Sequence, residues 1–175
     1  MRQQLEKALG DAFPFMQRGL SEKEQVEKWG HTRNIYDAYG MELGDGWYQV
    51  IWDMCAEITA VYETEGLPVD LVVDQVKEKF GTLRFYYHPK DQEAAIHAFD
   101  CLNEGASLRF QPGSSNVHQK TAEIVGKYET LSAQVCEICG KPGCLRKDLR
   151  RIQTLCEEHY HKNLNLIKKT KQRRQ

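Results

Sequence analysis

The chain has 175 residues, 41% of them hydrophobic and 28% charged, with a net charge of −1, as is ordinary for a soluble globular protein. No run approaches the ~20 apolar residues of a membrane span, and the first residues lack the apolar core of a signal peptide, so membrane and secreted classes are not expected. The six cysteines favour a reducing compartment, the cytoplasm, over a disulfide framework.

The N-terminal part predicts short helices. Apolar residues recur at helical spacing over residues 5–13, and Pro14 ends this helical pattern. Ser21 and Glu24 have the spacing of a capping box, which predicts a second helix ending near Gly30. Residues 31–41 are expected to form a helical turn or a loop.

The clearest helix follows a glycine-rich loop at residues 44–46. Its apolar residues mark one stripe from Trp47 to Tyr62, and Gly66 ends it. Asp45 is a candidate N-cap of this helix. Because the stripe is long and aromatic, we expect this helix to form the core of the body.

Two runs of β-forming residues, 69–77 and 82–88, predict an antiparallel hairpin with its turn at residues 79–81. Residues 91–104 predict a helix. Residues 111–116 are rich in Gly, Pro and Ser and predict a loop. A further helix, predicted over residues 121–134, runs directly into the cysteine-rich region.

Four residues have the spacing of a zinc site, in two pairs with two residues between the members of each: Cys136, Cys139, Cys156 and His159. Two such pairs suit one tetrahedral, structural Zn²⁺ per chain. Cys144 could replace Cys139, and His161 could replace His159. Reduced cysteines without metal, or a redox Cys-x-x-Cys, are the competing interpretations; a second ligand pair and the lack of a preceding βαβ pattern favour zinc.

The residues around the pairs indicate how the site is built. Gly140 and Gly143 predict a tight knuckle after the first pair, and residues 145–155 fit a short hairpin. The second pair opens a helical pattern. This order resembles the treble-clef class of zinc finger. We therefore expect an α+β fold in three parts: an acidic body (1–130) of helices and an antiparallel hairpin, a treble-clef-like zinc module (131–167) and a basic tail (168–175).

The net charge hides an asymmetry between the two ends. Residues 131–175 hold 11 Lys and Arg against 4 Asp and Glu, whereas the preceding 130 residues hold 13 against 21. A basic module on an acidic body suggests either a polyanionic partner or internal charge matching, and a merely solvated surface is the competing interpretation. The candidate phosphate contacts are the basic residues of the hairpin and tail: Arg146, Lys147, Arg150, Arg151, Lys168, Lys169, Lys171, Arg173 and Arg174. No aromatic residue interleaves them, so base readout is not expected.

Three stretches in order carry a family resemblance: Gly44 to Trp47, Val76 to Tyr86, and Cys136 to Gly140 with the later Thr154-Leu155-Cys156. Together they resemble small uncharacterised zinc-binding proteins of phages and prophage-bearing bacteria. The resemblance implies an origin in a mobile element and a location in the bacterial host cytoplasm. It carries no established activity.

These patterns suggest three candidate functions. The first is a non-catalytic protein whose zinc module docks on nucleic acid or a nucleoprotein. The second is a phage inhibitor of a host defence or transcription protein, whose acidic body mimics nucleic acid through residues such as Asp45, Asp70 and Asp74. The third is an HNH-type nuclease, which needs a histidine base on the hairpin; residues 145–155 contain none, so catalysis is not expected.

Overall fold

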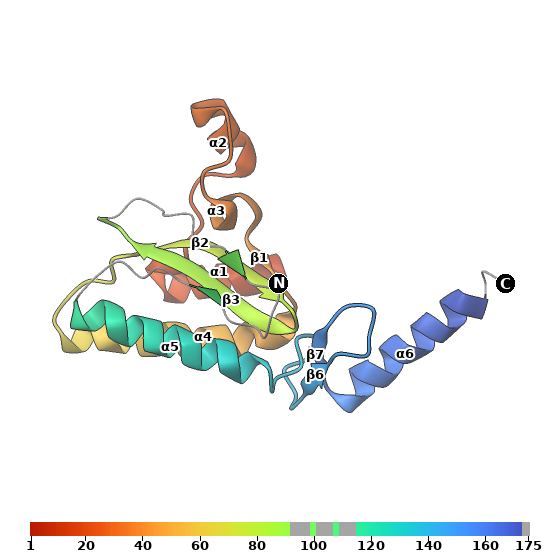
Figure 1. Ribbon diagram of the computed structural model, residues 1–175. Coiled ribbons are helices and arrows are strands. Elements are labelled where there is room, and N and C mark those ends of the chain that lie inside the picture. The colour runs from red at the N-terminus through yellow and green to blue at the C-terminus, as the bar shows by residue number, and fades with distance from the viewer. Residues whose placement is uncertain (92–98, 101–106, 109–114, 173–175) are drawn as a thin grey trace.

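The computed structural model describes residues 1–91, 99–100, 107–108 and 115–172, and they form an α+β fold, which confirms the predicted class (Figure 1). The body is built on a sheet of strand order β1-β2-β3. Strands β2 (Leu71–Lys79) and β3 (Thr82–Pro89) form the predicted antiparallel hairpin. Strand β1 (Met41–Glu42) pairs parallel to β2, in a segment that was expected to be a turn or loop. Two residues are too few to show a period, so the sequence could not reveal this strand.

The helices of the described chain fall close to their predicted places: α1 (Gln3–Ala12), α2 (Glu22–Trp29), α3 (Ile35–Tyr39), α4 (Tyr48–Thr64), α5 (Asn116–Ser132) and α6 (Glu157–Gln172), with short 3-10 turns η1 (Pro14–Met16) and η2 (Asp45–Trp47). The capping box of α2 is confirmed: the Ser21 side chain accepts from the Glu24 amide, and the Glu24 carboxylate accepts from the Ser21 amide. Helix α5 begins five residues earlier than predicted, because Ser115 caps it.

The core of the body lies between the sheet and the long helices. Helices α4 and α5 lie side by side, and α5 also contacts β3 (Figure 1). Ile51, Met54 and Ile58 of α4 are fully buried, as are Leu83 and Phe85 of β3. Burying each such side chain stabilises the fold by about 1.5–3 kcal/mol. The apolar stripe of α4 is therefore core packing, as its spacing predicts.

Two local predictions differ from the structure. Asp45 does not cap α4, whose N-cap is Trp47; its carboxylate instead accepts from the backbone and side chain of Arg2, a partner that local sequence cannot reveal. The helix predicted over 91–104 lies largely outside the described residues, as does most of the 111–116 loop. In the described part, β4 (Phe99–Asp100) pairs with β5 (Ser107–Leu108). The prediction of a helix is therefore wrong at residues 99–100.

The C-terminal region contains the predicted knuckle, hairpin and helix. Strand β6 (Cys144–Arg146) pairs with β7 (Gln153–Leu155), and α6 follows and projects away from the body (Figure 1). A small core of its own joins two of the cysteines to Leu149 and Leu155. The predicted boundaries at residues 130 and 167 fall inside α5 and α6, so the basic tail continues a helix as far as Gln172. Among the described helices, none is both long and apolar enough to cross a bilayer.

Candidate metal centre

Two turns of the backbone place the four predicted ligands. Cys136 and Cys139 lie on the knuckle, which is closed by a hydrogen bond of 2.9 Å from the Gly140 amide to the Cys136 carbonyl. Cys156 directly precedes α6, and His159 lies in the first turn of that helix. The Glu137 amide donates to the Thr154 carbonyl at 3.0 Å, so the knuckle and the β6–β7 hairpin are held together and the two ligand pairs converge.

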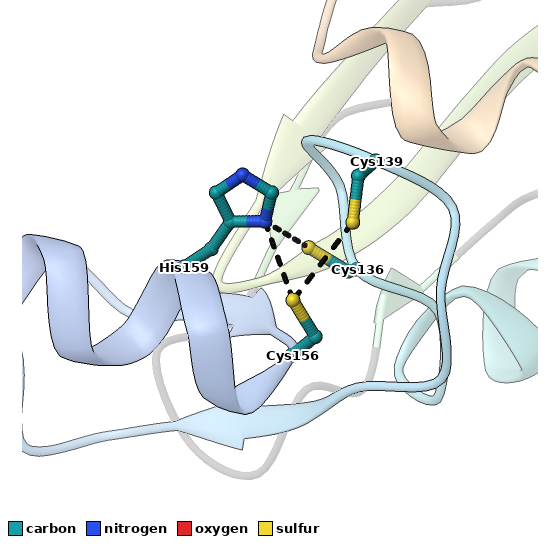
Figure 2. A group of neighbouring side chains, drawn as sticks. All are labelled: Cys136, Cys139, Cys156 and His159. Carbon is teal, nitrogen blue, oxygen red and sulfur yellow. Dashed lines mark hydrogen bonds between the residues drawn. The ribbon is translucent and has the colours of Figure 1, made fainter.

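The four ligand atoms lie within 4.8 Å of one another, and Figure 2 shows the side chains pointing toward a common centre. The His159 Nδ1 atom is 3.5 Å from the Cys136 sulfur and 3.3 Å from the Cys156 sulfur. The Cys139 and Cys156 sulfurs are 3.8 Å apart. A regular tetrahedron around zinc, with Zn–S of about 2.3 Å and Zn–N of about 2.05 Å, has edges of about 3.8 Å between sulfurs and about 3.5 Å between sulfur and nitrogen. The donor positions therefore fit tetrahedral coordination.

The surroundings of Cys156 favour its thiolate, whereas desolvation raises the pKa of Cys139. A hydrogen bond from the His159 backbone amide is the largest of the effects that lower the pKa of Cys156, to about 7. Cys136 is fully buried and Cys156 is 7% exposed, whereas Cys139 is exposed. Thiolates gathered this closely repel one another, and a bound cation removes that repulsion.

The two spare candidates lie outside the cluster. Cys144 is exposed at the start of β6, where it pairs with Leu155 in the strand register. His161 is exposed as well, and its Nε2 atom lies 3.6 Å from the Glu157 carboxylate, one turn away on α6. The structure thus brings together Cys136, Cys139, Cys156 and His159 as one group and leaves both substitutes apart from it.

The knuckle rests on the glycine-rich loop that precedes α4. The Gly46 amide donates to the Glu137 carbonyl at 2.9 Å, and the Trp47 indole N–H donates to the Val135 carbonyl at 2.7 Å. A Cβ atom on Gly46 would lie 2.1 Å from the Cys136 carbonyl oxygen, and one on Gly44 would lie 2.0 Å from that of Glu137. Only glycine allows this approach of two backbones.

A second contact joins the β6–β7 hairpin to the turn of the β2–β3 hairpin. The Thr154 hydroxyl donates to the Gly81 carbonyl at 2.6 Å, and a Cβ atom on Gly81 would meet the Leu145 side chain at 2.3 Å. Arg151 also forms an ion pair with Glu78, whose side chain is nearly buried. The metal-site module is therefore bonded to the body at two places.

These contacts unite the three stretches that carry the family resemblance. Residues 44–47 and the turn at the end of β2 meet the knuckle and the β6–β7 hairpin, although about 60 to 95 residues separate the contacting partners along the chain. Sequence reasoning missed this interface. The sequence signal that could have indicated it is the pair of glycines on either side of Asp45. A surface loop does not need two glycines, whereas close packing against another backbone does.

The basic residues predicted to contact phosphates fall into two groups. Arg146 pairs with Glu157, and its guanidinium carbon lies 4.2 Å from the centroid of the Tyr160 ring. Arg151 pairs with Glu78. In contrast, Lys147 and Arg150 are exposed and have no ion pair among the described residues. The hairpin therefore offers two uncommitted cations.

The remaining predicted contacts lie at the C-terminal end. Lys168, Lys169 and Lys171 belong to the last turns of α6, and Arg173 and Arg174 fall outside the described residues. The acidic residues singled out on the body are already engaged within it. Asp45 pairs with Arg2, Asp70 accepts from the Tyr62 hydroxyl at 2.5 Å, and Asp74 contacts His88 at 2.9 Å.

Three thiolates and one imidazole would complete a tetrahedral shell around one metal ion. The described residues therefore contain a group that can hold one metal ion. No protein-family model, curated protein or solved structure matches this chain, and its function is inferred from its own geometry.

Proposed function

We propose that Cys136, Cys139, Cys156 and His159 bind one structural zinc ion, and that the module so formed docks on nucleic acid. The observation that carries the metal assignment is the spacing of the donor atoms, 3.3 to 3.8 Å, which agrees with the edges of a zinc-centred tetrahedron. A set of three sulfurs and one nitrogen is typical of zinc, whereas Mg²⁺ and Ca²⁺ take oxygen ligands.

The metal assignment is tested by elemental analysis of protein purified without added metal. One zinc per chain is expected. Cys139→Ser should lose the ion, while Cys144→Ser and His161→Ala should retain it, because both residues lie outside the cluster. Protein that is folded and free of zinc, or a loss of zinc equal in all three variants, would contradict the assignment.

The docking proposal is supported by the distribution of charge. The exposed hairpin residues Lys147 and Arg150 are what we call the basic surface, and Lys168, Lys169 and Lys171 follow in the sequence of the last turns of α6. Because the acidic residues of this region pair with other residues, the two uncommitted hairpin cations are available to phosphates. Neutralising phosphates releases condensed counterions, so affinity should fall linearly with salt on a log–log scale.

The basic surface is tested with Lys147→Ala/Arg150→Ala. Removing two phosphate contacts should flatten the salt slope on duplex DNA by about 2, since each contact contributes about 0.9. Lys7→Ala/Lys23→Ala is the matched control, because it removes the same charge from two exposed lysines on the body. Equal slopes for the two double variants would reject the surface, and no binding at low salt would reject docking altogether.

A further inference from the structure

The turn of the β2–β3 hairpin contains an unusual residue. Phe80 has φ of +52° and Gly81 has φ of +77°, so the two-residue connection has the positive φ values of a type I′ turn. Positive φ is strained for a side chain as bulky as phenylalanine, and Asn-Gly is the preferred pair here. Phe80 is nevertheless 41% exposed, so core packing does not explain why it replaces asparagine.

One cationic side chain lies beside the Phe80 ring. The Lys79 ammonium lies 5.5 Å from its centroid. The next residue, Gly81, approaches Leu145 and the backbone of Gln153, and Glu78 pairs with Arg151, so the turn lies beside the loop that carries the hairpin cations of the basic surface. Strained residues that the surrounding structure maintains are concentrated at functional sites.

One carboxylate of the β2–β3 hairpin and one of the β6–β7 loop are engaged. Glu78 accepts from the Gly81 amide at 2.6 Å and pairs with Arg151. Asp148, within the β6–β7 loop, accepts from the Tyr160 hydroxyl. Phe80 is therefore a partly exposed aromatic residue with the Lys79 ammonium near its ring, on a turn that lies beside the β6–β7 loop.

We propose that Phe80 is a stacking platform for an unpaired base, so that the partner of the basic surface is single-stranded nucleic acid. This inference rests on the proposed docking function and names its substrate class. In a duplex the base faces are covered by their neighbours, whereas single strands offer faces that stack on aromatic side chains while lysine and arginine hold the backbone. Local sequence does not reveal this, because about 70 residues separate the β2–β3 turn from the β6–β7 loop and only the fold brings the two together.

The test compares Phe80→Asn and Phe80→Trp with the wild type in the zinc-loaded full chain. Binding is measured at low salt to fluorescein-labelled twelve-nucleotide oligo(dT) and oligo(rU), and to a twelve-base-pair duplex. Stacking of one base is worth about 1–3 kcal/mol, so Phe80→Asn should weaken single-strand binding by about 5- to 150-fold and change duplex binding by less than about twofold. The deoxy and ribo strands distinguish DNA from RNA as the natural ligand.

Phe80→Asn should also raise the melting temperature, because it relieves the strained turn; a loss of binding then cannot be assigned to misfolding. Phe80→Trp should keep the affinity, and its added indole fluorescence should be quenched by the single strands. Unchanged single-strand affinity in Phe80→Asn, or a wild-type preference for the duplex, would overturn the inference while leaving docking intact. If the wild type binds no nucleic acid at low salt, docking itself fails.

Discussion

Gly46→Ala tests whether the metal-site module and the body form one structural unit. The added Cβ atom would lie 2.1 Å from the Cys136 carbonyl oxygen and 2.5 Å from the Gly140 amide nitrogen, more than about 1 Å inside normal contact. Both neighbours are backbone atoms of the knuckle, so the knuckle must move away. That movement breaks the hydrogen bond from the Gly46 amide and strains the one from the Trp47 indole.

The loss can be estimated from these bonds. Each buried hydrogen bond contributes about 1 kcal/mol, and a buried group left without a partner costs about 1–3 kcal/mol more. Gly46→Ala should therefore reduce the free energy of unfolding by about 2–4 kcal/mol. The measurement is urea denaturation at a fixed zinc concentration, followed by both helix content and Trp fluorescence, since Trp47 lies at the contact.

The matched control is Gly126→Ala on α5. A Cβ atom on Gly126 meets nothing within 4 Å, and alanine is favoured in a helix interior by about 0.5–1 kcal/mol, so this variant should be slightly more stable than the wild type. If Gly46→Ala unfolds within about 0.5 kcal/mol of the wild type, the close approach of the two backbones does not contribute to stability and the reasoning fails.

Three further predictions concern the same region. Chelation of the metal should increase hydrogen exchange around Cys156 and in the first turn of α6, and added zinc should restore protection, because binding and folding of the site are coupled. Trp47→Phe should cost about 1–3 kcal/mol in urea denaturation, because it leaves the Val135 carbonyl without its donor. Arg151→Ala should destabilise the protein more than Arg150→Ala, since only Arg151 pairs with the nearly buried Glu78 carboxylate; equal stability of the two would contradict this.

Features set by neighbouring residues were predictable from the sequence. The capping box at Ser21, the two ligand pairs and the β2–β3 hairpin each depend on residues a few positions apart. Features set by distant residues were not. Asp45 has the character of an N-cap, but Arg2 competes for its carboxylate from 43 positions away. Likewise, nothing local shows that Arg151 is neutralised by Glu78, 73 positions earlier.

The bond between the Trp47 indole and the Val135 carbonyl joins residues 88 positions apart. Its consequence lies in the order of synthesis. A ribosome adds about 5–20 residues per second, so on the order of 5–20 s pass between the appearance of the indole donor and that of its acceptor. During that interval α4 can form and pack against other apolar residues. The Trp47 indole N–H at its start, however, has no acceptor until Val135 has been synthesised. The nascent body is therefore complete only when the knuckle has been made.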